Sequence, residues 1–251
     1  MKVFSVYGNT KSGKTTVIEN IIMELRKRRY SVGSIKEIHF ESFTMEREGT
    51  NTFRHKAAGS QLVTARGLKE TDILYPRTLS IPEILCHYDQ DYVVCEGVTD
   101  YNMPRIVTGQ SVEELDQRWG TGIFAVSGRI AETLKEYRGI PVINALQECE
   151  RLVDLIEEKV FSLLPDVDEA CCHACGTNCR DFCDGVLNGR FRQEDCVQYE
   201  KKVKVSLDGK PMDLVPFVQN VISATVTGLI SQLNGYQKNR TISIEIPGDS
   251  H

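Results

Sequence analysis

Long apolar runs are absent from this 251-residue sequence. No stretch approaches the ~18 consecutive apolar residues of a membrane span, and the apolar run at the N-terminus is too short for a signal peptide. Proline is scarce, with 8 residues, and the sequence contains no internal repeat and no Gly/Ser/Pro-rich tract long enough for a disordered linker. These absences predict an ordinary globular protein of the cytoplasm that does not bind membranes.

An excess of positive charge is also missing. The net charge of -5 argues against broad electrostatic attraction to nucleic acid or to an anionic membrane, so we expect neither as a partner. One local basic cluster, Arg26 to Arg29, lies at the expected end of a helix, where cations complement the helix dipole. The simplest interpretation of this cluster is structural.

Hydrophobic periodicity predicts an α/β fold for residues 1–166. Residues 3–7 form a short apolar run that ends at Gly8 and predicts a buried first strand, and a helix with apolar residues every three or four positions follows. Strands then alternate with helices, which indicates a P-loop NTPase-like, mostly parallel sheet with helices on both faces. Later strands are expected at 31–35, 91–97, 105–107, 123–126 and 141–143, and later helices at 52–66, 81–85 and 145–163.

The pattern changes in residues 167–251. A cysteine-rich segment is followed by alternating apolar and polar residues around Asp208-Gly209, a strong hairpin turn signal. Apolar residues recur at helical spacing between Phe217 and Leu233, and residues 241–246 alternate as a strand. We therefore predict a small C-terminal α+β domain.

Residues 8–15 read GNTKSGKT and match the phosphate-loop pattern G-x-x-x-x-G-K-[ST] between a strand and a helix. Backbone N–H groups of such a loop and the helix N-terminus bind phosphates, and Lys14 reaches the β- and γ-phosphates. Thr15 supplies a hydroxyl for magnesium. Asn9 stands where one subclass of these loops carries a second lysine. The predicted nucleotide-binding residues are Gly8, Asn9, Thr10, Lys11, Ser12, Gly13, Lys14, Thr15 and Thr16.

A carboxylate at the end of a buried strand normally completes the magnesium site. Glu96 follows the apolar run 92–95 and fits that place. Asp91 begins the same strand and would lie at the wrong edge, because ligands collect at the carboxyl ends of parallel strands. A strand-end salt bridge is the alternative role for Glu96.

The sequence resembles the MobB family, the molybdopterin-guanine dinucleotide biosynthesis protein B group of P-loop proteins. Three stretches carry the resemblance: YGNTKSGKTTVIENII at the phosphate loop, SIKEIHF to EGTNTFRHKAAGS at 34–60, and VVCEG at 93–97. The similarity extends over about residues 1–165. Its middle stretch is the discriminating part, because phosphate loops alone are common.

The resemblance implies a specific function. Members of the family bind GTP with magnesium, hydrolyse it weakly and form homodimers. They assist the partner nucleotidyltransferase that attaches a nucleotide to the molybdenum cofactor. Carried onto this sequence, the resemblance implies phosphate binding by residues 8–16, magnesium ligation by Thr15 and Glu96, and a role for the Arg-His pair at Arg54 and His55.

Three departures from the family pattern bear on this transfer. Residues 49–52 read GTNT where the family usually has Gly-Lys-Asp-Ser, so a cation and a carboxylate are lost together. Val98 and Thr99 stand where an aromatic residue and a lysine commonly follow the Glu-Gly pair. Ser127 and Gly128 end a strand where an acid is expected to read the guanine edge, so the preference for GTP rests on the resemblance.

The cysteine-rich segment contains the spacing C-x2-C-x3-C-x16-C, formed by Cys172, Cys175, Cys179 and Cys196. In a reducing compartment, clustered cysteines bind metal or do redox chemistry more often than they form disulfides. Four thiolates satisfy either a [4Fe-4S] cluster or a tetrahedral zinc ion. Three close cysteines and a remote fourth favour the cluster. Zinc and redox-active thiols remain the alternatives.

Two cysteines of this segment are surplus to the predicted site, Cys171 and Cys183. Cys183 lies four residues after Cys179, on the same helical face, and is a possible replacement ligand; His173 is a weaker one. The cysteines outside the segment stand in apolar surroundings and are expected in the core, as free cysteines usually are. They are Cys86, Cys95 and Cys149.

Three functions fit these features. The first is a GTP-binding accessory protein of molybdenum or tungsten cofactor biosynthesis, with weak GTPase activity and an iron-sulfur domain. The second is an iron-sulfur scaffold or electron-transfer adaptor that serves a client molybdoenzyme and is gated by nucleotide. The third, a small-molecule kinase, fits the phosphate loop but lacks an arginine-rich lid after the central strands.

Overall fold

A computed structural model describes most of the chain. The described residues are 1–40, 43–44, 47–164, 175–196, 199, 203, 205–208, 210–212, 214, 216–237 and 242–246. Among them, no helix combines the length and the apolar character needed to cross a bilayer.

Five parallel strands form the central sheet, with the first strand in the middle. Because all four pairings are parallel, the carboxyl ends of the strands share one edge, where the phosphate loop follows β1. This confirms the predicted mostly parallel α/β architecture. The strands are β1 (Lys2–Gly8), β2 (Val32–Lys36), β5 (Tyr92–Glu96), β6 (Arg105–Thr108) and β7 (Ile123–Ser127), and their order in the sheet is β2-β5-β1-β6-β7.

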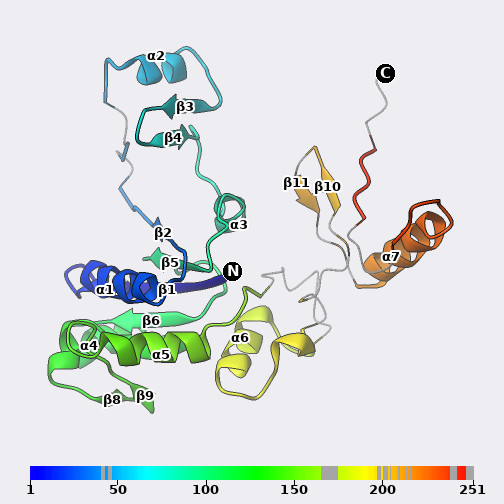
Figure 1. Cartoon of the computed structure of the whole chain (residues 1–251). Helices are drawn as coiled ribbons and strands as arrows, with labels where there is room; N and C mark the ends of the chain where they lie inside the picture. The colour runs from blue at the N-terminus through cyan, green and yellow to red at the C-terminus, as the bar shows by residue number, and fades with distance from the viewer. Residues whose placement is uncertain are drawn as a thin grey trace.

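Helices cover both faces of this sheet (Figure 1). Alternate residues of β1 point to opposite faces, so Phe4 packs with α1 (Lys14–Lys27) and α5 (Cys149–Lys159), whereas Val3 packs with α3 (Ile81–Leu85). Tyr7, on the face of Val3, packs near α4 (Val112–Arg118) through Leu115. The apolar side chains of each helix therefore pack against the face of the sheet that the helix covers.

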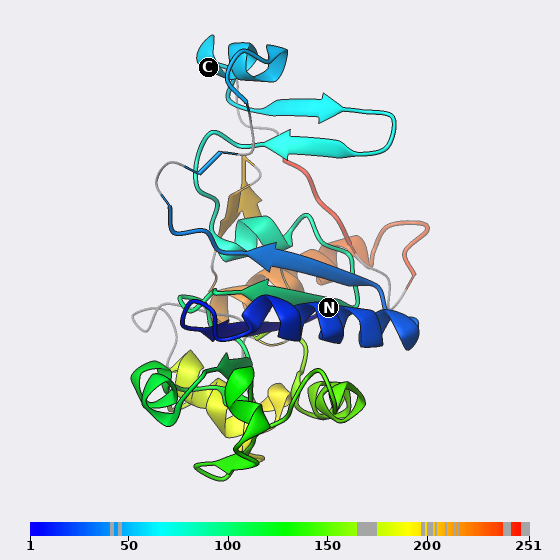
Figure 2. The same cartoon turned by 90° about the vertical axis from the view of Figure 1, so that its left-hand side faces the viewer.

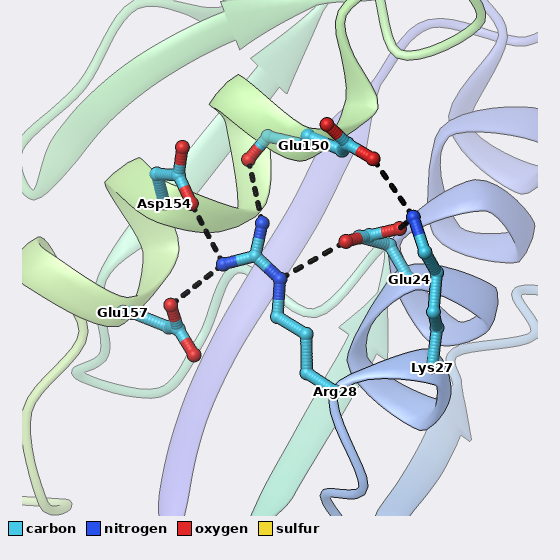
Figure 3. Close-up of polar contacts among 6 residues, drawn as sticks. All are labelled: Glu24, Lys27, Arg28, Glu150, Asp154 and Glu157. Carbon is cyan, nitrogen blue, oxygen red and sulfur yellow. Dashed lines mark hydrogen bonds and ion pairs between the residues drawn. The ribbon is translucent and has the colours of Figure 1, made fainter.

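Ion pairs join the C-terminal end of α1 to the length of α5 on one face of the sheet. Arg28 is central, because its Nη1 lies 2.7 Å from carboxylate oxygens of both Asp154 and Glu157. The network, drawn in Figure 3, consists of Glu24, Lys27, Arg28, Glu150, Asp154 and Glu157. Two members of the basic cluster at 26–29 therefore have a structural role, although it is ion pairing with α5, which the sequence did not predict, in addition to a place at the helix end.

A small arm follows β2 and stands apart from the sheet in both Figure 1 and Figure 2. It consists of α2 (Asn51–Ala57) and the antiparallel hairpin of β3 (Val63–Arg66) and β4 (Thr71–Leu74). The prediction of a helix at 52–66 is therefore wrong in its second half. The helix ends before Gly59, whose φ of 99° is left-handed, and the chain then turns into a strand.

Residues after β7 complete the edge of the sheet. The 3-10 helix η1 (Arg129–Glu132) precedes a short antiparallel pair, β8 (Glu136–Tyr137) and β9 (Ile140–Pro141). Val142 forms a parallel bridge with Val126 of β7, so the strand expected at 141–143 reaches the sheet only as this bridge.

The C-terminal region contributes one helix to the main core and a separate hairpin and helix. Phe182 and Cys183 of α6 (Cys179–Leu187) are buried in the same cluster as α1 and α5. The 3-10 helix η2 (Gln193–Asp195) follows. The predicted turn at Asp208 joins β10 (Val205–Leu207) to β11 (Lys210–Met212), and α7 (Pro216–Ile230) matches the predicted helix.

The prediction of a strand at 241–246 is wrong for the described residues 242–246, which form no strand. Their alternating pattern has no partner strand, and the side chains of Ile244 and Ile246 are exposed. Alternation favours a strand only where a second strand supplies hydrogen bonds.

Candidate nucleotide-binding site

The phosphate loop connects β1 to α1 at the carboxyl edge of the sheet. Two glycines allow its path. A Cβ on Gly8 would lie 2.1 Å from the carbonyl oxygen of Thr108, so only glycine lets the two strands approach here. Gly13 is the N-cap of α1 with a φ of 99°, a left-handed conformation that other residues rarely adopt. The loop therefore directs its backbone into the first turn of a 14-residue helix.

Buried hydroxyl groups support the loop from beneath. The hydroxyl of Thr108 donates to the carbonyl of Tyr7 at 3.1 Å, and the hydroxyl of Ser12 lies 2.6 Å from that of Thr108. The main-chain N–H of Arg129 donates to the carbonyl of Ser12 at 3.2 Å. The ends of β6 and β7 thus fix the middle of the loop.

Lys14 bends back over the loop. Its ammonium donates to the carbonyl oxygens of Gly8, at 3.1 Å, and Asn9, at 2.8 Å. Burial lowers the pKa of Lys14, the nearby Glu96 opposes this shift, and Lys36 and Arg118 add to it. The ammonium is therefore held among the backbone groups that the motif assigns to phosphate binding.

Thr15 and Glu96 meet at the same edge, as the sequence predicted for a magnesium site. The hydroxyl of Thr15 donates to Oε1 of Glu96 at 3.0 Å, and the ammonium of Lys36 lies 2.6 Å from the same oxygen. A hydroxyl beside a carboxylate is an all-oxygen donor set, which is the kind that magnesium prefers. The pair fits that ion, and Lys36 fixes the carboxylate.

Arg118 is a neighbour of the loop that the sequence did not predict. Its Nε donates to Oδ1 of Asn9 at 2.7 Å. The two residues are separated by 109 positions, and no local pattern marks the contact. Only the placement of α4 beside β1 brings them together.

Arg54 and His55 lie elsewhere. They are exposed residues of α2 in the arm, and none of the α2 side chains is buried. Figures 1 and 2 show this helix separated from the phosphate loop between β1 and α1. The structure does not bring the predicted Arg-His pair to the site.

The predicted cysteine ligands are described only in part. Cys175, Cys179 and Cys196 are half-buried, whereas Cys172 lies outside the described residues, as do Cys171 and His173. Among the described side chains, no group of three or more potential metal ligands is assembled. Cys183 is 1% exposed and packs in the hydrophobic core, which favours an apolar role for it. The four-cysteine site remains a prediction.

The cysteine segment packs at the edge of the sheet opposite the phosphate loop. Asn102, which precedes β6, donates to the carbonyl of Cys179 at 2.8 Å. The N–H of Gly122, directly before β7, donates to Asp184 at 3.3 Å. Figure 1 accordingly shows α6 on the side where the N-terminus and the start of β1 lie. The sheet therefore separates the two candidate sites.

Comparison with known proteins relates the sheet region to one sequence family. The model of the family "Molybdopterin guanine dinucleotide synthesis protein B", MobB, matches residues 3–126, which include the phosphate loop, the arm and Glu96. Over residues 3–126 the chain is similar to the MobB family. The match agrees with the resemblance seen in the sequence.

A solved structure supports the fold of this MobB-like region. The crystal structure of Bacillus subtilis MobB superposes with a TM-score of 0.55 at 23% sequence identity, and the match covers 65% of this chain and 100% of that one. At this identity the likeness shows the fold. Because the Bacillus structure is covered completely, the rest of this chain has no counterpart in it.

Two curated relatives match over different lengths. A Methanocaldococcus jannaschii protein with the provisional name molybdopterin-guanine dinucleotide biosynthesis adapter protein is 29% identical over 252 aligned positions, 98% of this chain and 97% of that protein. A Bacillus subtilis protein with a similar provisional name is 27% identical over 57% of this chain and 85% of its own length. The region beyond the MobB-like region is thus shared with the archaeal relative.

Proposed function

We propose that this protein is a GTP-binding adapter in molybdopterin-guanine dinucleotide biosynthesis. One observation carries the proposal: a MobB-like region in which Lys14, Thr15 and Glu96 converge at a phosphate loop. The names of the two curated relatives agree with it.

In this proposal the loop binds the phosphates and magnesium supports them. The N–H groups of residues 8–16 and the N-terminus of α1 face the phosphate chain, and Lys14 exchanges its carbonyl contacts for phosphate oxygens. Thr15 and Glu96 would hold magnesium, Glu96 through water. Bound by these two residues, magnesium would supply positive charge to the β- and γ-phosphates. We propose only weak hydrolysis, because no residue was identified that would position the attacking water.

The partners in this proposal are a second copy of the chain and the nucleotidyltransferase that attaches a nucleotide to the cofactor. The arm supports an interaction role, because its exposed apolar side chains lie away from the sheet. They include Phe53, Leu62, Leu68 and Ile73. Light scattering of the purified protein, alone and with the transferase, tests both associations.

A maturation assay tests the adapter function. Molybdoenzyme activity in cells that lack their own adapter should be restored by this protein and not by the Lys14→Ala variant. Equal restoration by both proteins would show that nucleotide binding is dispensable. Turnover that depends on a small phosphate acceptor would instead favour a kinase.

We further propose that Cys172, Cys175, Cys179 and Cys196 hold a [4Fe-4S] cluster, with zinc as the alternative occupant. Their sequence spacing supports this proposal, as does the anchoring of Cys179 through Asn102. Anaerobic purification followed by iron, sulfide and zinc analysis tests it. Cys175→Ala should lose the metal. Cys86→Ala should keep it, because Cys86 lies outside the segment; it is exposed, so the core position predicted for it from the sequence is wrong.

A further inference from the structure

Two cations bind the same residue of the phosphate loop. Asn9 accepts a hydrogen bond from Lys14 at its main-chain oxygen, at 2.8 Å, and one from Arg118 at its side-chain oxygen, at 2.7 Å. Lys14 belongs to the motif, whereas Arg118 comes from the end of α4. A second positive charge therefore lies beside the loop.

The backbone at Arg118 is well fixed. The hydroxyl of Tyr7, the residue directly before the loop, donates to the carbonyl of Arg118 at 2.8 Å. The next residue, Trp119, packs edge-on against Tyr137 with ring centroids 5.1 Å apart, and Arg138 lies over the Trp119 ring. These contacts hold the end of α4 at the loop while the Arg118 side chain stays exposed.

The guanidinium of Arg118 keeps most of its hydrogen-bonding capacity for a ligand. A guanidinium has five N–H donors, and the Nε bond to Asn9 is its one hydrogen bond to the described residues. None of the ion pairs among the described residues includes Arg118. An anion between Arg118 and Lys14 would relieve the repulsion between their charges.

The residue type at position 9 of the loop bears on the role of Arg118. One subclass of phosphate loops carries a second lysine at this place in the motif, and here the residue is a neutral amide. The neighbouring α4 supplies a cation instead. A guanidinium also differs from an ammonium, because it binds two phosphate oxygens at once.

We propose that Arg118 contacts the terminal phosphate of a bound nucleoside triphosphate and so makes the site prefer triphosphate over diphosphate. This inference rests on the proposed nucleotide site. Arg118 is a phosphate-contacting, specificity-determining residue in this account. In an adapter that prefers GTP to GDP, hydrolysis determines whether nucleotide stays bound, even when hydrolysis is slow.

Calorimetric titration of the full-length protein with GTP and with GDP, both with magnesium, tests the inference. Arg118→Ala should weaken GTP binding about 10- to 100-fold, because a hydrogen bond to a charged group is lost, and GDP binding by less than about threefold. Arg118→Lys should recover part of the GTP affinity. Arg151→Ala, which removes an exposed arginine of α5, is the control for net charge.

Two further variants separate the ways in which the inference can fail. If Arg118 acts only by holding the loop, Asn9→Ala should lose as much GTP affinity as Arg118→Ala does. Arg118→Ala should then also lose GTP and GDP affinity equally, and this result would overturn the inference. If Arg118→Ala binds GTP as the wild type does while Lys14→Ala does not, the nucleotide site stands and the role of Arg118 fails. If Lys14→Ala also binds normally, the proposed nucleotide site itself fails.

Discussion

The hydroxyl of Thr15 lies 3.0 Å from a carboxylate oxygen of Glu96, although 81 positions separate the two residues in the sequence. The parallel pairing of β1 with β5 creates this proximity, because it aligns Val6 with Glu96 and places the loop after β1 beside the end of β5. The proposed magnesium site at these two residues depends on this register.

Replacement of Glu96 should uncouple nucleotide binding from magnesium. Glu96→Gln keeps the shape of the side chain and removes its charge, so the gain in GTP affinity on adding magnesium should shrink about 10-fold. Titrations with and without magnesium measure this gain. Glu136→Gln, at an exposed residue of β8, is the control, and an unchanged magnesium effect in Glu96→Gln would contradict the assignment.

Removal of Arg28 should loosen the contact between α1 and α5. Arg28→Ala leaves the carboxylates of Asp154 and Glu157 without their shared cation, and we expect a loss of about 1–2 kcal/mol in the free energy of unfolding. Urea denaturation measures this value. Arg26→Ala removes a side chain whose hydrogen bond goes to the carbonyl of Tyr30, and it should cost less than about 0.5 kcal/mol. Equal effects of the two variants would contradict a special role for the network.

Cys95 should resist thiol reagents until the protein unfolds. It is fully buried in β5, and burial raises the pKa of its thiol to about 12. At about pH 8, alkylation followed by peptide mass spectrometry should modify the exposed Cys86 first and leave Cys95 unmodified. Similar labelling rates for the two cysteines would show that β5 is accessible in solution.

The same pKa shift predicts a loss of stability in alkali. Because the folded pKa of Cys95 lies above its unfolded value of about 8.5, its contribution is complete below about pH 8.5 and declines as the pH rises toward 12. Cys95→Ser changes this dependence by removing the titrating thiol. Urea denaturation as a function of pH would contradict the account if the wild type and the variant lost stability in parallel.

The cysteine segment and the nucleotide site should respond separately to mutation. Asn102→Ala removes the hydrogen bond to the carbonyl of Cys179 and should speed proteolysis within residues 175–196, while GTP affinity stays unchanged. Limited proteolysis and calorimetry measure the two effects. If GTP affinity fell together with protease resistance, the chain segment from Glu96 to Asn102, which links β5 to β6, would couple the two edges of the sheet.

The sequence predicted the features that depend on local spacing or on a general rule of parallel sheets. The phosphate loop is a contiguous motif, and Glu96 was identified because it ends a buried strand. Arg118 was missed because its contact with Asn9 depends on where α4 packs. Strand β3 was mistaken for helix because the turn after Ala57 depends on the conformation of Gly59.

In the C-terminal region, too, a local feature was predicted and a long-range contact was not. The turn at Asp208 was predicted from two adjacent residues, and the hairpin forms there. The packing of Cys183 in the core beneath α1 and α5 was not predicted, because it depends on contacts between distant segments. Alternation at 241–246 suggested a strand, yet the described residues 242–246 form none.

Calorimetric titration of GTP with magnesium into the wild-type protein and Lys14→Ala tests the central claim most directly. Circular dichroism should first confirm that both proteins are folded. The account predicts saturable binding of one GTP by each wild-type chain and no measurable binding by Lys14→Ala. Absence of binding in the wild type, or equal binding by both proteins, would contradict it.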